Sequence, residues 1–204
     1  KDEYIPLMKE HDVPDWYIKS CEKIKYMFPK AHAAAYVTNA FRIAWFKVHI
    51  PLAYYAAYYS IRAKAFDAQY MIFGKEKVKN KMKEIEMKNQ KKEATKAELD
   101  MYDDLEIVLE MYERGFEFLP VDIYESEASK FKIQDNKLRP PLNSIPGFGT
   151  VAAQGIVNAR KDGKFMSIDD LKIRAKIGAS GAELLKQFGC LEGMSQSNQL
   201  SLFG

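Results

Sequence analysis

The sequence predicts a mainly α-helical protein with a helical first part, a small β-hairpin, a pair of short-helix units and a flexible C-terminal tail. Three observations lead to this prediction. Apolar residues recur at helical spacing through the first half of the chain. Two short β-prone segments flank Asp135-Asn136, a pair that favours a tight turn. After Pro140, short apolar helices alternate with glycine-containing turns.

Prolines mark the starts of three helices in the first half. Pro14 suits the first position of a helix that runs toward Met27, and Pro29 allows a new start. Pro51 begins an aromatic-rich helix with four tyrosines. The helix after Pro29 carries a broad apolar face at helical spacing, which consists of Ala33, Ala34, Ala35, Val37, Ala40, Phe41, Ala44, Trp45 and Val48.

Glycines and a cap set the helices that follow. Residues 67–73 are expected to form a short helix, which Gly74 separates from a lysine-rich one. Thr95 and Glu98 form a T-x-x-E capping box, and Gly115 supplies the stop at the end of that helix.

The character of the chain changes after Gly115. Residues 118–124 include several β-prone side chains, and the segments 130–133 and Lys137–Arg139 form the predicted hairpin. We therefore expect a boundary between a helical domain and a second domain near residues 115–125. Residues 193–204 are too polar to form a core and are expected to be a flexible tail.

The composition fits a globular protein. With 47% hydrophobic and 13% aromatic residues, the 204-residue chain can bury a core. The net charge of +3 is too small to indicate a nucleic-acid binder by itself. Residues 75–92 carry eight Lys and three Glu, whereas residues 98–113 carry seven acidic residues and no basic one. We interpret these runs as two solvated helix faces of opposite sign.

Cysteine usage and hydropathy indicate the compartment. Cys21 and Cys190 lie far apart and belong to no CxxC pair, which argues against a disulfide scaffold or zinc site and favours a cytoplasmic location.

The apolar stretch 33–61 is interrupted by three basic residues and a proline, so we expect no membrane span. The chain begins at Lys1 without a methionine, and we expect it to be a fragment or a processed chain.

The sharpest internal motif is Ile145-Pro146-Gly147-Phe148-Gly149, followed by Thr150 and an apolar helix. An apolar residue, Gly-x-Gly and a helix form the helix-hairpin-helix pattern. The glycines let the turn approach a ligand, and the first amides of the helix favour a phosphate oxygen without reading a base. Arg160, Lys161 and Lys164 are close enough in sequence to add positive charge.

A second glycine turn follows about 30 residues later. Ser167 and Asp170 cap one helix, and residues 177–181, with Gly178 and Gly181, then lead into a helix from Ala182. This spacing predicts a tandem of helix-hairpin-helix units, with phosphate binding at the first turn. The second turn is degenerate, and it either binds phosphate or only packs against the first. A simple helical turn without DNA binding is the structural alternative for both.

The last residues place Gln199, Leu200, Leu202 and Phe203 on the tail. Exposed Leu and Phe on a mobile end cost solubility unless a pocket receives them, and a short peptide can insert such anchors into a groove. The alternative is that Leu202 and Phe203 fold back onto the parent domain. The pentapeptide resembles the Gln-Leu-x-Leu-Phe motif that binds the bacterial sliding clamp.

The segment Lys30-Ala31-His32-Ala33-Ala34-Ala35-Tyr36 resembles the Lys-x-His-Ala-Ala-Ala-Tyr segment in the fingers of bacterial family-C replicative polymerases. Residues 14–203 resemble the C-terminal region of the PolC-type alpha subunits of DNA polymerase III. The order of parts agrees: fingers, tandem helix-hairpin-helix units, then a terminal clamp peptide. Gly204 departs from this pattern, since such chains commonly end at the phenylalanine, and Arg139 and the lysines of 88–92 are also individual to this sequence.

The resemblance implies a role for each part. Residues 1–116 would be a partial fingers region, 117–192 a domain that binds duplex primer-template DNA, and 193–204 a tail that binds the sliding clamp (the beta subunit). Contacts to the incoming deoxynucleoside triphosphate are expected from Tyr26, Phe28, Lys30, His32 and Tyr36. For Tyr36, Phe28 and His32, a place in a core is the alternative.

Phosphoryl transfer needs carboxylates that hold two metal ions. The resemblance implies that Mg2+ and its aspartates belong to a palm domain upstream of Lys1, and we expect no cofactor or metal in this chain. The pairs Asp103-Asp104 and Asp169-Asp170 are interpreted as parts of a solvated helix and a cap. The chain is thus expected to be part of a DNA-directed DNA polymerase, inactive alone. A DNA-repair or recombination adaptor and a purely structural helical protein are the alternatives.

Overall fold

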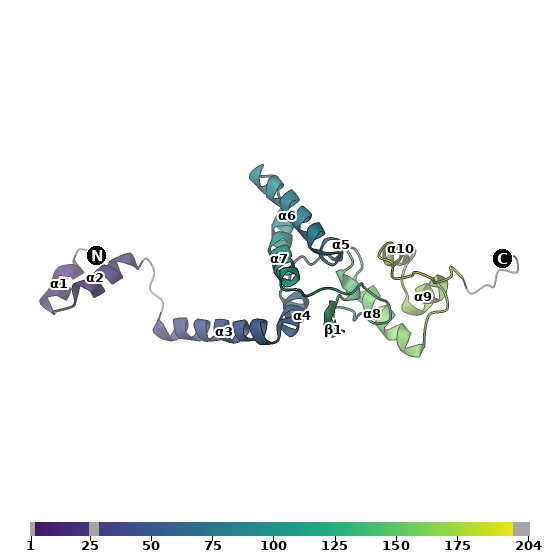
Figure 1. Cartoon of the computed structure of the whole chain (residues 1–204), viewed down its shortest axis with the longest axis horizontal. Coiled ribbons are helices and arrows are strands. Elements are labelled where there is room, and N and C mark those ends of the chain that lie inside the picture. Colours follow the sequence, from purple (N-terminus) through teal and green to yellow (C-terminus); the bar gives the residue numbers. More distant parts are fainter. Residues whose placement is uncertain (1–2, 25–28, 198–204) are drawn as a thin grey trace. The chain divides into compact units, whose positions relative to one another are not determined.

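The computed structural model describes residues 3–24 and 29–197 of the chain (Figure 1). The chain divides into two compact units, residues 1–45 and 46–204. The boundary falls within one helix, α3 (Lys30–His49). The predicted fold class is confirmed, because helices dominate both units and a single short hairpin is the sheet of the described part.

The first unit contains α1 (Tyr4–Glu10), α2 (Asp15–Lys23) and most of α3, as far as Trp45. Pro14 is the N-cap of α2, one residue before the helical position that was predicted for it, and the helix ends earlier than expected because Ile24 is already extended. Ile18 is buried between α1 and α2. The described side chains of α3, including its predicted apolar face, are not buried.

The second unit begins with four helices: α4 (Pro51–Ile61), α5 (Ala68–Met71), α6 (Lys75–Gln90) and α7 (Lys96–Glu113). The predicted capping box is present, because Thr95 accepts from the Glu98 amide while the Glu98 carboxylate accepts from the Thr95 amide. The predicted stop is present too, since Gly115 has φ +82°. Their shared core contains Tyr55, Tyr59, Met71, Val78, Ile85, Leu105, Val108, Met111, Phe118 and Leu138.

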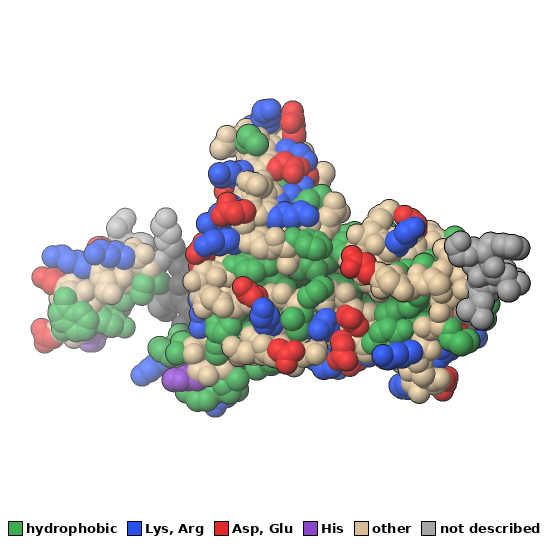
Figure 2. All heavy atoms as spheres, turned by 45° about the vertical axis from the view of Figure 1, so that its right-hand side comes forward, with side chains coloured by type: hydrophobic (Ala, Val, Ile, Leu, Met, Phe, Trp, Pro, Cys, Tyr) green, Lys and Arg blue, Asp and Glu red, His purple; other side chains and the backbone are tan. Residues whose placement is uncertain are grey.

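The oppositely charged runs of α6 and α7 pair with each other. Lys75 and Lys79 both reach Glu113, at 3.6 and 3.1 Å, and Lys88 lies 2.6 Å from Glu98. Figure 2 shows basic and acidic side chains interspersed on this part of the surface. The two faces of opposite sign are exposed to solvent in part, as interpreted, and in addition each run supplies ion-pair partners for the other.

The predicted hairpin forms from β1 (Lys132–Gln134) and β2 (Lys137–Arg139), which pair antiparallel. Asp135 and Asn136 both have positive φ, as the two-residue turn requires. The β-prone stretch before it forms no strand beyond one bridge, between Phe118 and Leu138. Its chain turns instead, because the Asp122 carboxylate accepts from two following amides, at 2.7 and 2.9 Å.

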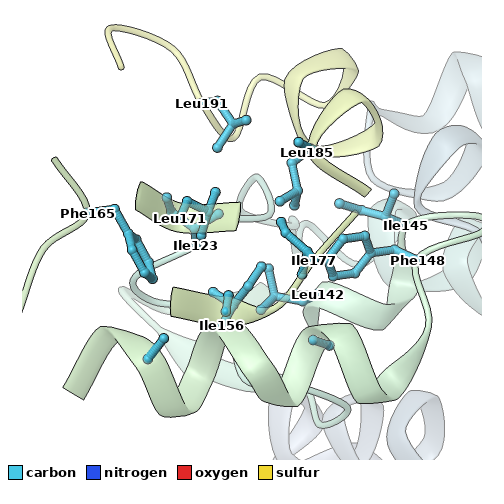
Figure 3. Close-up of a cluster of buried hydrophobic side chains, with 14 of the residues drawn as sticks. Ile123, Leu142, Ile145, Phe148, Ile156, Phe165, Leu171, Ile177, Leu185 and Leu191 are labelled. Carbon is cyan, nitrogen blue, oxygen red and sulfur yellow. The ribbon is translucent and has the colours of Figure 1, made fainter. Parts of the chain in front are cut away.

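The last part of the second unit contains η1 (Leu142–Ser144), α8 (Thr150–Ala159), η2 (Arg160–Asp162), α9 (Ile168–Ala175) and α10 (Ala179–Gln187). These short helices surround a second core (Figure 3), which includes Ile123, Leu142, Ile145, Phe148, Ile156, Phe165, Leu171, Ile177, Leu185 and Leu191. Within the described residues, no helix is long and apolar enough to cross a membrane. The division into three functional parts at residues 116 and 192 stays a prediction.

Candidate nucleic-acid interface

The first glycine turn joins η1 to α8 and has the conformation that its sequence predicts. Gly147 has φ +79°, a left-handed angle that favours glycine. Gly149 has an extended backbone and is the N-cap of α8. Ile145 and Phe148 are buried and fix the turn to the core, whereas Gly147, Gly149 and Thr150 are exposed. The turn is thus anchored by its apolar residues and presents its backbone to solvent.

The N-terminus of α8 is open. Gly149 offers no side-chain acceptor to the first amides, and the first turn contains no acidic residue. These amides carry the positive end of the helix dipole, so an anion is favoured there. Thr150 accepts a hydrogen bond from Asn143 and is held beside the opening.

The N-terminus of α9 is closed by comparison. The Ser167 hydroxyl accepts from the amide of Asp170, as the predicted cap requires. The carbonyls of Ser195 and Gln196 accept from the next two amides, those of Ile168 and Asp169, at 2.9 and 3.1 Å. Acidic side chains also occupy this first turn. An anion would find neither open donors nor a favourable charge here.

The second turn repeats the first, but with different residues from those expected. Lys176 has φ +54° and takes the place of Gly147, while Gly178 is the extended N-cap of α10 and takes the place of Gly149. Ile177 is buried beside Phe148, as Figure 3 shows. The helix begins at Ala179, before the predicted Ala182. Gly181 therefore lies inside α10, where an added Cβ would be 3.4 Å from the Phe148 ring.

Sequence reasoning missed the glycine that brings α8 close to α9. A Cβ on Gly155 would lie 2.3 Å from the carbonyl oxygen of Ala175, a distance that requires the backbone to shift. The small residues of α8 are the signal that indicates such an approach, but they do not identify which helix approaches.

Arg160 holds the loop before the hairpin against the end of α8. Its guanidinium donates to the carbonyls of Ile123 and Ser126, at 3.1 and 2.6 Å, and is half-buried at the C-terminal end of α8. Lys161 and Lys164 are exposed. Arg174, which sequence reasoning did not single out, donates to the carbonyls of Ala159, Gly163 and Lys164 and lies over the Phe165 ring.

The acidic pairs have structural partners. Asp104 is buried, which corrects the expectation of a solvated helix, and its carboxylate accepts from the amides of Lys64 and Ala65. Burial raises the pKa of this carboxyl group above its usual value. Asp170 accepts from the Met166 amide and from Arg174. Among the described residues, no three or more His, Cys, Asp or Glu side chains are grouped to hold a metal ion.

The expected nucleotide contacts lie on or before α3. Lys30 is the first residue of this helix, and its first turn contains no acidic residue. His32 and Tyr36 are one turn apart with ring centroids 4.4 Å from each other. Tyr26 and Phe28 lie outside the described residues, as do Gln199, Leu200, Leu202 and Phe203 of the tail.

Comparison with known proteins matches residues 115–200 to the helix-hairpin-helix motif family. Over the whole chain, the sequence is 52% identical to the PolC-type DNA polymerase III of Oceanobacillus iheyensis. It is 52% identical over 98% of its length to that of Caldanaerobacter subterraneus subsp. tengcongensis, and 51% over 97% to that of Clostridium perfringens.

This chain belongs to the PolC-type DNA polymerase III family. It spans 14% of the length of each of these relatives. Family membership confirms the resemblance found in the sequence, and these relatives give no support to a separate repair or recombination adaptor.

Proposed function

We propose that this chain is the part of a PolC-type, DNA-directed DNA polymerase that grips duplex primer-template DNA through the turn at Gly147–Gly149. The observation that carries this proposal is the open N-terminus of α8, with exposed amides and no acidic side chain. Within the same fold, the N-terminus of α9 differs, because a side-chain cap and two backbone carbonyls accept from its first amides. Phosphate oxygens fit an open helix N-terminus by charge and by hydrogen bonding.

Binding of this kind contacts the sugar-phosphate backbone and no base edge. Affinity should therefore be independent of DNA sequence and should fall steeply as salt concentration rises. Both properties suit a polymerase, which must hold every sequence that it copies.

Gly149→Asp tests the proposal because it separates folding from binding. An added Cβ at Gly149 meets no atom within 4 Å, and its φ of −69° suits any residue. Asp is a favourable N-cap, so the helix should be as stable as before or more so. Its carboxylate would occupy the amides and repel a phosphate, and loss of a hydrogen bond to a charged group costs about 1.5–3 kcal/mol. Duplex affinity, measured by fluorescence anisotropy, should fall accordingly.

Gly149→Ser is the matched control, since it caps the same amides without a charge. We expect its affinity to lie between those of the wild type and Gly149→Asp. Unchanged affinity in a folded Gly149→Asp protein would contradict the assignment of this turn.

The second turn is proposed as a weaker contact, through Gly178 and the first residues of α10. Its N-terminus is also open, and Gly178 has room for a side chain, with only the Ser180 hydroxyl at 4.0 Å from an added Cβ. Gly178→Asp should reduce duplex affinity less than Gly149→Asp. Equal affinity to the wild type would show that this turn only packs.

We propose that α3 contributes contacts to the incoming deoxynucleoside triphosphate. Lys30 adds a cation to a first helical turn without acidic residues, a combination that favours a triphosphate. His32 and Tyr36 lie on the same side of the helix, one turn further on. In the full-length polymerase, Lys30→Ala and His32→Ala should raise the KM for nucleotides or lower kcat, and unchanged kinetics would contradict this role.

We propose that residues 199–203 bind the sliding clamp and tether the polymerase to DNA. The support is the Gln-Leu-x-Leu-Phe pattern itself, which follows soon after Ser195 and Gln196, whose carbonyls accept from amides of α9. Deleting residues 199–204 should abolish clamp binding in a pull-down and leave duplex affinity unchanged. Clamp binding by the truncated protein would refute this assignment.

We expect the chain alone not to polymerise DNA, because Asp104 and Asp170 are committed to backbone amides rather than to metal ions. Primer extension by the isolated chain with Mg2+ and nucleotides would contradict this expectation. The rest of the polymerase chain is then the partner that supplies the metal-binding carboxylates.

A further inference from the structure

Two hollows flank the glycine turn within the second unit, and they differ in charge. One is lined by residues 65–67, which connect α4 to α5, by Met101 and by residues 143–149. The other, about 280 Å³ in volume, lies between the start of α6, the C-terminal half of α10 and Pro146 of the turn. The first contains a carboxylate, whereas the second contains the ammonium of Lys77.

Lys77 differs from the paired lysines of its helix. Lys75, Lys79, Lys81 and Lys88 each lie within ion-pair distance of a glutamate. Within the described part of the chain, no carboxylate lies that close to Lys77. Its ammonium instead lies 4.6 Å from the centroid of the Phe73 ring, which orients it without using its hydrogen-bond donors on an oxygen.

Apolar rings and polar side-chain amides line the groove beside Lys77. Phe73 and Phe188 form its apolar side, with ring centroids 6.2 Å apart, and Phe73 is 54% exposed. Gln69 and Gln187 contribute side-chain amides that have no hydrogen-bond partner among the described residues. A deoxyribose-phosphate strand presents the same combination, an apolar sugar face beside an anionic phosphate.

We propose that this groove, formed by Gln69, Phe73, Lys77, Pro146, Gln187 and Phe188, holds the DNA backbone next to the phosphate bound at the glycine turn, with Lys77 neutralising one phosphate. The proposal rests on duplex binding at that turn. Pro146 belongs to the turn and also lines the groove, so the two sites are adjacent. The opposite hollow contains the carboxylate of Asp67, which makes it a less favourable place for a phosphate.

The test compares Lys77→Gln with Lys83→Gln in the whole chain. Both substitutions remove one positive charge from α6, and Lys83 is exposed and outside the groove. Duplex affinity is measured by anisotropy over a range of salt concentrations. Lys77→Gln should weaken binding uniformly across DNA sequences and reduce the slope of log K against log salt by about 1. Lys83→Gln should match the wild type.

A second pair of variants adds a charge instead of removing one, so a gain in affinity cannot be explained by a loss of folding. Gln187→Lys adds a cation to the groove and should tighten binding and steepen the slope, whereas Gln90→Lys, at the far end of α6, should not. Equal slopes for Lys77→Gln and the wild type, or equal losses in both lysine variants, would overturn the proposal. If the groove instead holds an acidic protein segment, Lys77→Gln and the wild type will show equal salt slopes for duplex DNA.

These outcomes separate this inference from the proposed function. If Gly149→Asp loses duplex affinity while Lys77→Gln retains the wild-type slope, the turn binds DNA and the groove does not. If the wild-type chain binds no duplex, both proposals fail.

Discussion

The two turns at residues 147–149 and 176–178 build one backbone shape from different residues. In each, a left-handed residue is followed by a buried apolar residue and an extended glycine N-cap. The left-handed position is Gly147 in the first turn and Lys176 in the second. The repeat is thus a repeat of backbone conformation and burial, whereas only the N-cap glycine is shared. Glycine adopts the left-handed angle of the first turn without backbone strain, whereas Lys176 in the second turn adopts it with some strain.

The largest effect on stability is expected at the contact between α8 and α9, the two helices that lie between the turns. Gly155→Ala places a Cβ 2.3 Å from the Ala175 carbonyl, immediately before the second turn. Because backbone must move to relieve this contact, the free energy of unfolding should fall by about 3 kcal/mol, the upper end of the overpacking range. Thermal unfolding measures the change.

Gly149→Ala is the matched control, since its Cβ meets no atom within 4 Å. It should leave the midpoint of unfolding close to that of the wild type. A Gly155→Ala protein as stable as this control would show that α8 and α9 are less closely packed than described.

A truncation tests how much the two carbonyls that close the N-terminus of α9 contribute to stability. Removing residues 195–204 deletes the carbonyls that accept from the amides of Ile168 and Asp169. The loss of two hydrogen bonds, at about 1 kcal/mol each, should lower the free energy of unfolding by about 2 kcal/mol. Removing only residues 199–204 retains both bonds, so denaturant unfolding of that protein should match the wild type. Equal stability of both truncations would mean that the bonds contribute nothing.

Gly147→Ala tests the left-handed position of the first turn. Its added Cβ would lie 3.5 Å from a Leu184 methyl group, an ordinary contact, so the cost comes from the backbone angle. An L-residue in this region is less stable by about 1–2 kcal/mol, and we expect about 1 kcal/mol here. Urea unfolding of this protein and of Gly149→Ala measures the difference. No difference between them would show that the turn can change its backbone without loss.

The sequence predicts the positions of helices well where a local signal is strong. Prolines 14 and 51, the Thr95 capping box and the Asp135-Asn136 turn all act within a few residues, and each is found within one residue of its predicted position. The first glycine turn belongs to the same class, because its pattern of apolar, glycine and helix residues is local.

The departures from prediction have two causes: a residue type that the glycine pattern does not anticipate, and side-chain partners distant in sequence. The helix after the second turn begins earlier than predicted, because Lys176, and not a glycine, adopts the left-handed angle and Gly178 is the N-cap. Asp104 was expected in solvent because the amides that it binds lie some 40 residues earlier in the chain. Arg160, which the sequence predicts to add positive charge near the first turn, also donates to loop carbonyls that come from before the hairpin. Side-chain partners of this kind have no local pattern.

Lys176→Gly gives the smallest expected effect and the most direct test of the comparison between the turns. Glycine at φ +54° removes the left-handed strain of a lysine but adds freedom to the unfolded chain, and these effects oppose each other. We expect a net gain of about 0.5 kcal/mol in the free energy of unfolding, the sign opposite to that of Gly147→Ala. Lys176→Ala separates charge from backbone, because it removes the ammonium and keeps the Cβ. If the glycine variant is no more stable than the alanine variant by urea unfolding, the backbone at Lys176 is not strained, and the two turns are less alike than their angles indicate.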